Sequence, residues 1–187
     1  MALSRRHFVA TGSAGLLTFM VGGCEQQLTP GEAKQQRAEL KVLSLSETQT
    51  LDALAEQLVP GASEAGIEYF LDHQLAAPAD QQLLMMKYLG VPQPWQEFYA
   101  GGLRGMNGAA NSLYKKNYLD LSADQQLELA SKLAAGSIAD WDGPPQAFFY
   151  FVLRSDAVDV VYGTEAGFAK LGIPYAAHVS PPSEWGQ

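Results

Sequence analysis

Cysteine and histidine are scarce in this 187-residue chain, and their scarcity excludes several kinds of site. There is one cysteine, Cys24, and of the three histidines only His73 and His178 follow it. A single cysteine rules out an internal disulfide, a four-thiolate iron–sulfur cluster and a thiolate zinc site, and no Cys-x-x-Cys-His run for covalent haem occurs. The sequence therefore predicts no metal site and no cofactor-binding site in this chain.

Basic charge is also in short supply. The chain has 12 Lys and Arg against 20 Asp and Glu, and its net charge is −8. Nucleic acids and anionic lipid surfaces bind basic patches, so this balance excludes nucleic acid as a partner and electrostatic docking to a membrane. We expect any membrane attachment to come from a lipid.

Motifs for nucleotide binding and serine hydrolysis are missing too. The glycines of residues 101–105 occur inside a helical pattern rather than after a strand, and there is no Gly-x-Ser-x-Gly run. A small enzyme that uses Asp156 and Asp159 as acid and base is one alternative. Without a substrate-shaped context we interpret them as capping or pairing groups beside Arg154, and we predict no catalytic residue.

The apolar stretch Val9–Val21 is too short and too rich in small residues to span a bilayer, which requires about 20 apolar residues. It follows the run Ser4-Arg5-Arg6-His7-Phe8, in which Ser4, Arg5, Arg6 and Phe8 match a twin-arginine (Tat) export signal. The Tat translocon moves folded proteins across the bacterial inner membrane. We therefore assign residues 1–23 to a signal segment, with an ordinary secretory signal as the alternative.

Cys24 closes the run Val21-Gly22-Gly23-Cys24, which is similar to a lipobox, where the cysteine is acylated and becomes the mature N-terminus. Removal of the first 23 of 187 residues leaves 164, enough for one domain with a substantial core. Residues 24–45 are polar and predict a lipid-anchored linker. The prediction is a periplasmic protein held at the membrane by lipidated Cys24; a removed or buried thiol is the alternative.

Residues 46–187 predict an all-α fold, a single compact multi-helix domain that ends in an extended tail rich in glycine, proline and aromatic residues. Ser46-Glu47-Thr48-Gln49 and Ser122-Ala123-Asp124-Gln125 are capping boxes, which begin helices. Apolar spacing, proline and glycine define the other limits. The expected helices cover residues 46–59, 67–77, 80–89, 94–113, 122–135 and 145–161. Leu83, Leu84, Tyr88 and Leu113 are expected to face inward.

Two of these helices have unusual composition. In residues 94–113, Gly101, Gly105, Gly108 and Ser112 fall on one stripe, although a helix-interior glycine costs about 1 kcal/mol relative to alanine. The stripe predicts close approach of another helix, and a break at Gly101-Gly102 is the alternative. Residues 147–161 are apolar nearly all round, which is typical of a central helix buried by its neighbours; a strand over 148–153 is the alternative.

The most distinctive segment lies towards the C-terminus. Tyr162, Gly163, Phe168, Tyr175 and Trp185 stand on a frame of glycine and proline. Aromatic side chains are enriched at protein interfaces. These residues are the candidate contacts for a partner protein, and packing against the chain's own domain is the alternative.

The chain resembles the gluconate 2-dehydrogenase subunit 3 family over most of residues 46–187. Three features carry the resemblance: Arg5-Arg6, the helix that ends in Val59-Pro60-Gly61, and the run of Tyr162-Gly163, Gly167-Phe168 and Leu171-Gly172-Ile173-Pro174. Many members have Asp-Pro before the Tyr-Gly and Gly-Asn after it. This chain has Val160-Val161 and Thr164-Glu165 there, which indicates a divergent branch.

The resemblance implies a role without catalysis. In that family the small subunit carries no cofactor, while a large subunit of the glucose–methanol–choline type binds FAD and oxidises the substrate, often with a cytochrome c subunit as electron acceptor. The small subunit is thought to supply the export signal and to stabilise the large one. We therefore expect an accessory subunit of a periplasmic, FAD-dependent sugar or alcohol dehydrogenase. A stand-alone periplasmic helical binding lipoprotein with a closed apolar pocket is the alternative.

Overall fold

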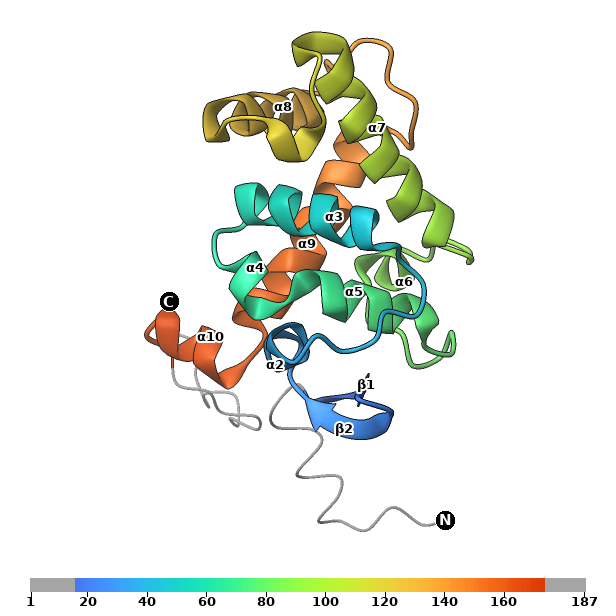
Figure 1. The fold of residues 1–187 in the computed structure, drawn as a ribbon, viewed down its shortest axis with the longest axis vertical. Helices are drawn as coiled ribbons and strands as arrows, with labels where there is room; N and C mark the ends of the chain where they lie inside the picture. Colours follow the sequence, from blue (N-terminus) through green and yellow to red (C-terminus); the bar gives the residue numbers. More distant parts are fainter. Residues whose placement is uncertain (1–15, 174–187) are drawn as a thin grey trace, which may run out of the picture.

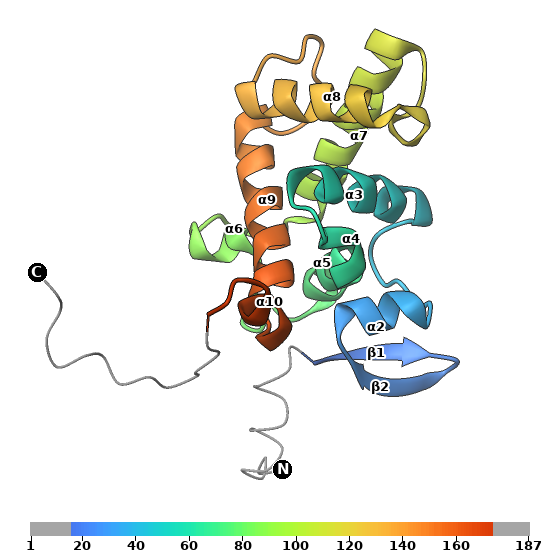
Figure 2. The same cartoon turned by 90° about the vertical axis from the view of Figure 1, so that its left-hand side faces the viewer.

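A computed structural model describes residues 16–173 and confirms the all-α prediction. Helices pack against one long helix, and a two-stranded hairpin lies at one end (Figures 1 and 2). The elements are β1 (Leu17–Val21), β2 (Cys24–Leu28), α2 (Pro30–Gln35), α3 (Leu45–Leu58), α4 (Ala62–Ala65), α5 (Ile67–Ala76), α6 (Met85–Tyr88), α7 (Gln96–Tyr114), the 3-10 turn η1 (Tyr118–Asp120), α8 (Ala123–Ala135), α9 (Gln146–Tyr162) and α10 (Glu165–Lys170). Within residues 16–173, no helix has the length and apolar character needed to cross a membrane. The expected tail lies almost entirely outside the described residues.

The N-cap of helix α3 lies two residues earlier than predicted. Its N-cap is Ser44, whose hydroxyl accepts a hydrogen bond from the Glu47 N–H at 3.3 Å, while the Glu47 carboxylate accepts from the Ser44 N–H at 2.8 Å. The predicted box Ser46–Gln49 is therefore wrong. The two patterns overlap, and the carboxylate of Glu47 accepts a stronger hydrogen bond than the amide of Gln49 does. The second predicted box, Ser122–Gln125, is confirmed at the start of α8.

The helix predicted over residues 80–89 is also wrong, because α6 covers only its second half. Side chains from other helices accept hydrogen bonds from the backbone N–H groups that a longer helix would use. Gln74 Oε1 accepts from the Leu83 N–H at 2.7 Å, and Asp156 Oδ1 accepts from the Met85 N–H at 2.7 Å. The turn before α6 is therefore set by distant parts of the chain.

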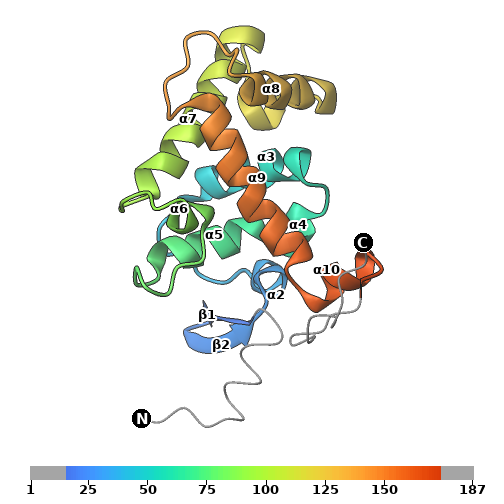
Figure 3. The same ribbon diagram turned by 180° about the vertical axis from the view of Figure 1, so that it is seen from behind.

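Helix α9 forms the centre of the fold, as predicted, and packs against α3 to α8 and against α10. It crosses the back of the molecule diagonally, from α8 to α10 (Figure 3). Phe149, Val152, Leu153 and Ala157 are fully buried. One side differs from the expectation of complete burial, because Phe151 is 48% exposed. The alternative of a strand over residues 148–153 is wrong.

The glycines of α7 allow close approach, but to aromatic rings rather than to another helix backbone. A Cβ on Gly102 would lie 2.2 Å from the Phe149 ring of α9, and one on Gly105 would lie 2.7 Å from the Trp141 ring. Gly108 has open space where its Cβ would be. Helix α7 runs unbroken through these glycines, so the alternative of a break is wrong.

Part of the expected signal segment and of the expected linker has regular structure. Residues 17–23 of the expected signal and residues 24–28 of the expected linker form a hairpin, in which Val21 pairs with Cys24. Gly22 and Gly23 have φ of 59° and 79°, which glycine adopts without strain and which suits a two-residue hairpin turn. Because the stretch was interpreted by its hydrophobicity, this Gly-Gly turn was missed. The boundaries at residues 23 and 45 stay predictions.

Candidate functional site

A groove of about 980 Å³ lies beside α10, and we call it the α10 groove. Its walls come from the start of β1, α2, the α4–α5 turn, the α6 region and the α9–α10 junction, which lie in the lower half of the molecule in Figure 2. The apolar side chains that line it include Leu17, Phe70, Leu83, Tyr88, Val160 and Val161. A hollow of this size with an apolar lining is typical of a binding site.

The α9–α10 junction brings backbone segments into contact, and its two glycines make this possible. A Cβ on Gly163 would lie 2.4 Å from the Asp159 carbonyl oxygen, and one on Gly167 would lie 2.4 Å from the Val161 carbonyl oxygen. Thr164 begins α10 by accepting a hydrogen bond from the Gly167 N–H at 3.0 Å. The Tyr-Gly and Gly-Phe motifs therefore shape one wall of the groove.

Helix α10 ends at a third glycine of the same segment. Gly172 has φ of 68°, and the Ile173 N–H donates to the Phe168 carbonyl oxygen at 3.0 Å, which is the pattern of a helix that stops at glycine. Leu171 and Ile173 are about half exposed around this stop. Apolar surface therefore continues past the end of α10.

The structure places part of the predicted partner interface at the groove. Gly163 lines it, Tyr162 is half-buried against the apolar cluster that joins α3, α4 and α9, and Phe168 is half-buried in α10. The close contact with the Asp159 backbone is enough to explain why residue 163 is a glycine, whether or not a partner binds there. Tyr175 and Trp185 lie outside the described residues.

The remaining predicted residues concern export and anchoring. Cys24, the predicted lipidation site, is exposed at the hairpin turn. Outside the described residues lie Ser4, Arg5, Arg6 and Phe8.

Sequence reasoning missed the exposed apolar rim of the groove. Leu83 and Tyr88, expected to face inward, are 48% and 66% exposed and line the groove, whereas Leu84 is buried as predicted. Leu113, also expected inward, is exposed near the end of α7. No spacing rule identifies Leu83 and Tyr88, because the turn before α6 depends on hydrogen bonds from other helices. Exposed apolar side chains gathered at a hollow are typical of an interaction site.

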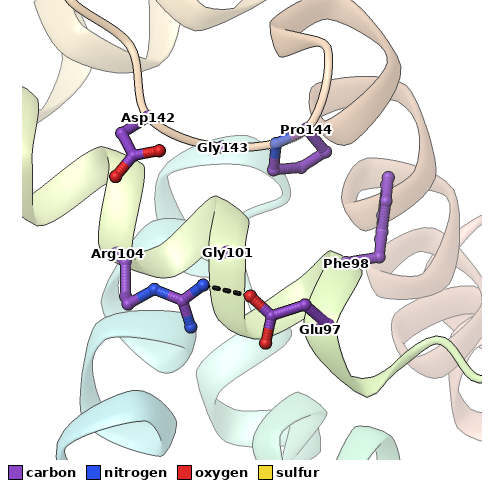
Figure 4. Close-up of a pocket in the computed structure, with 7 residues that line it drawn as sticks. All are labelled: Glu97, Phe98, Gly101, Arg104, Asp142, Gly143 and Pro144. Carbon is purple, nitrogen blue, oxygen red and sulfur yellow. Dashed lines mark hydrogen bonds and ion pairs between the residues drawn. The ribbon is translucent and has the colours of Figure 1, made fainter.

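A second hollow, of about 350 Å³, lies between α7 and the loop at residues 142–144 (Figure 4). Glu97 and Arg104 of α7 form an ion pair there, and Asp142 extends from the loop above them. Both paired side chains are more than half exposed, and such a pair contributes little to stability in water. None of the described residues that line this hollow is a serine, cysteine or histidine that would serve as a nucleophile or base.

Asp156, one of the two carboxylates considered for catalysis, is buried where α6, α7 and α9 meet. It accepts hydrogen bonds from the Tyr99 hydroxyl and from the Met85 N–H, both at 2.7 Å. Burial raises the pKa of Asp156 to about 7, although both hydrogen bonds oppose the shift. Asp159, whose charge also raises the pKa of Asp156, lines the α10 groove, whereas Asp156 does not line it. Asp156 acts as a structural link between three helices.

A second buried carboxylate ties α2 to the body of the domain. The Lys34 ammonium lies 2.8 Å from Asp52 and 3.0 Å from Glu68, and it donates to the Ser63 hydroxyl at 2.8 Å. Burial and the neighbouring Asp52 raise the pKa of Glu68 to about 7, while Lys34 opposes the shift. Within residues 16–173, no three His, Cys, Asp or Glu side chains are arranged to hold a metal ion.

Comparison with known proteins identifies a family. The sequence profile described as gluconate 2-dehydrogenase subunit 3 matches residues 46–178, which include α3 to α10 and the glycine junction of the groove wall. No curated protein and no solved structure matches the chain. The profile covers well over half of the sequence, and its description is that of a dehydrogenase subunit. The chain belongs to the gluconate 2-dehydrogenase subunit 3 family.

Proposed function

We propose that this chain is a non-catalytic accessory subunit of a periplasmic, FAD-dependent sugar or alcohol dehydrogenase. The observation that carries the proposal is the match of residues 46–178 to a family of dehydrogenase subunits. In this proposal FAD and catalysis belong to a larger subunit of the glucose–methanol–choline type, and a cytochrome c subunit takes the electrons. The accessory chain supplies an export signal and a surface that stabilises the larger subunit.

The α10 groove is the surface on which we place the larger subunit. Its exposed apolar rim, Leu83 and Tyr88, is typical of a protein interface. Leu171 and Ile173 extend this apolar area beyond α10. The groove wall at Gly163 and the other junction residues also lies inside the segment that matches the family, which supports a contact shared by its members.

Export and anchoring form the second part of the proposal. Arg5 and Arg6 direct the folded assembly to the Tat translocon, and Cys24 carries the lipid that holds it at the membrane. The exposure of Cys24 at a hairpin turn supports its accessibility to a modifying enzyme. A folded flavoprotein without its own signal would travel with this chain.

Purification from the native host tests the proposal. Tagged protein extracted from membranes in mild detergent should elute with a much larger chain and with a flavin absorbance spectrum. Addition of the partner's sugar or alcohol substrate should bleach that spectrum. A colourless single chain, under conditions that preserve complexes, would contradict the proposal.

Two matched substitutions test the position of the interface. Leu171→Asp places a charge beside the α10 groove, and Leu127→Asp places one on α8 at the opposite end; the two leucines are 53% and 54% exposed. We expect Leu171→Asp to lower flavin co-purification at least tenfold, because a carboxylate would have to be buried against apolar surface. Leu127→Asp should leave it unchanged. Equal effects of the two substitutions would remove the groove from the proposal.

Export is tested with Arg5→Lys and Arg6→Lys together. These changes keep the charge of the signal segment but remove the arginine pair that the Tat translocon requires. The expected result is that both this chain and the dehydrogenase activity stay in the cytoplasm. Unchanged periplasmic activity would contradict the export role and leave the interface question open to the Leu171 test.

A stand-alone periplasmic binding lipoprotein is the second candidate function. The observation that favours it is the volume of the α10 groove, about 980 Å³, which is near the upper end of small-molecule sites. This candidate predicts a chain that purifies alone and is monomeric. A flavoprotein partner in the eluate would exclude it.

A further inference from the structure

Strand β1 has two roles that exclude one another. Residues 17–21 are the last apolar residues of the proposed signal segment, and in the structure they form a strand paired with β2. The proposed cleavage site before Cys24 coincides with the tight Gly22-Gly23 turn of this hairpin. A signal segment must leave the domain to enter a translocon, and a protease requires an accessible, extended backbone. The hairpin must therefore open before either step.

One side chain fastens β1 to the domain. Phe19 is 3% exposed and is the only residue of β1 that is buried. Its ring lies 5.3 Å from the His73 ring and 6.4 Å from the Tyr69 ring of α5, centroid to centroid. Leu28, Ala33 and Ala38 are the other buried members of this small apolar cluster, and Leu17 and Val21 of β1 pack against it. Phe19 therefore acts as an anchor, and the buried residues around it all follow Cys24.

A backbone hydrogen bond also holds β1 to the domain, but the attachment of the strand stays weak. The Glu39 N–H donates to the Met20 carbonyl oxygen at 2.9 Å, which joins β1 to the segment after α2. A two-stranded hairpin is only marginally stable alone, and here it is supported by two buried side chains, Phe19 of β1 and Leu28 of β2. Helix α2 has its own tie through Lys34 to Asp52 and Glu68. Strand β1 can therefore leave while α2 stays in place.

We propose that the N-terminal hairpin, residues 17–28, is an autoinhibitory latch on the precursor: it folds the end of the signal segment onto the domain, and only its open form is exported and cleaved. The proposal rests on the export role given above. Closure competes with translocon binding and with cleavage, so the precursor is withheld from both in proportion to the population of the closed form. Weaker packing around Phe19 should therefore release the precursor for translocon binding and cleavage.

Ala38→Leu tests the latch without changing the signal segment. Ala38 is buried in the Phe19 cluster, and three added carbons would occupy space that the Phe19 ring fills. Hydrogen exchange on the purified full-length precursor should show protected amides in residues 17–28 of the wild type. Ala38→Leu should accelerate their exchange at least tenfold while α7 to α9 keep theirs. In cells, cleavage of the Ala38→Leu precursor should be faster than that of the wild type.

A second pair of substitutions guards against misfolding of the Ala38 variant. Phe19→Ala removes the anchor, and Met20→Ala removes a similar amount of apolar surface from the half-buried neighbouring position. Phe19→Ala should accelerate exchange in residues 17–28 at least tenfold, and Met20→Ala should change it much less. Wild-type exchange as fast as an unfolded chain, or equal effects of the two substitutions, would overturn the latch.

The two proposals fail in different ways. If the paired change of Arg5 and Arg6 to lysine leaves export unaltered, the Tat role fails, and hydrogen exchange still decides whether the hairpin closes. If export depends on the arginines but Ala38→Leu speeds exchange without speeding cleavage, the latch is not inhibitory and the inference fails alone.

Discussion

The two ends of the molecule are held together by different interactions. At the α8 end, formed by α7, α8 and the first half of α9, aromatic rings pack directly onto helix glycines, as Phe149 does on Gly102. At the α10 end, formed by the hairpin, α2, α4, α5 and α10, carboxylates bind ammonium and backbone N–H groups. At the first end the contacts are mainly steric, whereas the second end adds charge and hydrogen bonding to the close approaches of Gly163 and Gly167.

Asp72 shows how the α10 end is held. Its carboxylate accepts hydrogen bonds from the N–H groups of Lys41, Val42 and Leu43, each at 2.8 Å. These bonds fix the connection from α2 to α3, which contains no regular structure of its own. Together with the Lys34 cluster, they position the N-terminal region against the domain. The same connection reaches the main core, because Leu43 belongs to that core and Val42 packs against it. The difference teaches that the groove and the latch belong to the end where polar contacts set the position of the chain.

The largest expected effect breaks the α8 end. Gly102→Ala would place a methyl group 2.2 Å from the Phe149 ring, so the α7–α9 contact would have to separate. We expect a loss of about 3 kcal/mol in the free energy of unfolding, measured by urea denaturation. Gly108→Ala is the matched control on the same helix, where open space should allow a gain of up to about 1 kcal/mol. Similar losses in both would mean that the rings do not lock this end.

A smaller effect is expected from breaking the α10 end. Asp72→Ala leaves three N–H groups without their acceptor, and we expect a loss of about 2 kcal/mol in the free energy of unfolding. Hydrogen exchange should become faster in residues 41–43 and in the hairpin, and stay unchanged in α8. Glu39→Ala, which removes an exposed carboxylate nearby, serves as control. Uniform acceleration across the whole domain would show that the two ends are not independent.

The third effect concerns pH at the link between the two ends. Because the pKa of Asp156 is raised from 3.8 to about 7, the folded protein retains a proton that the unfolded chain has released. The stability that this proton contributes is complete below about pH 4 and is lost as the pH rises to 7, with a slope of at most about 1.4 kcal/mol per pH unit.

Asp156→Asn should flatten this dependence, because the amide stays neutral and still accepts from the Met85 N–H. The measurement is the urea midpoint at pH 5 and pH 8 for the wild type and the variant. Glu68 titrates in both proteins and leaves a residual slope. Exposed Asp124→Asn should keep the wild-type slope. An unchanged slope in Asp156→Asn would contradict the assignment.

Sequence reasoning succeeded where local rules decide the structure. Periodicity and the Ser122–Gln125 box located α8, and the Pro-Pro start with its long apolar run located α9. It failed where distant residues decide. Asp156 lies 71 positions after Met85, yet it accepts a hydrogen bond from the Met85 N–H and so limits where α6 begins. The α7 glycines likewise fit the Trp141 and Phe149 rings, which come from later parts of the chain. The α10 groove joins five separate segments, so only its glycine junction was visible as a motif.

The position of Leu17 in the wall of the α10 groove has a practical consequence for recombinant work. A protein expressed from Cys24 lacks β1, so its groove is missing one wall and β2 has a free strand edge. The sequence of β2, Cys24-Glu25-Gln26-Gln27-Leu28, is mostly polar and suits solvent exposure, whereas β1 is mostly apolar. Full-length and shortened proteins therefore present different shapes at the surface proposed to bind the partner, and an interaction screen should include both.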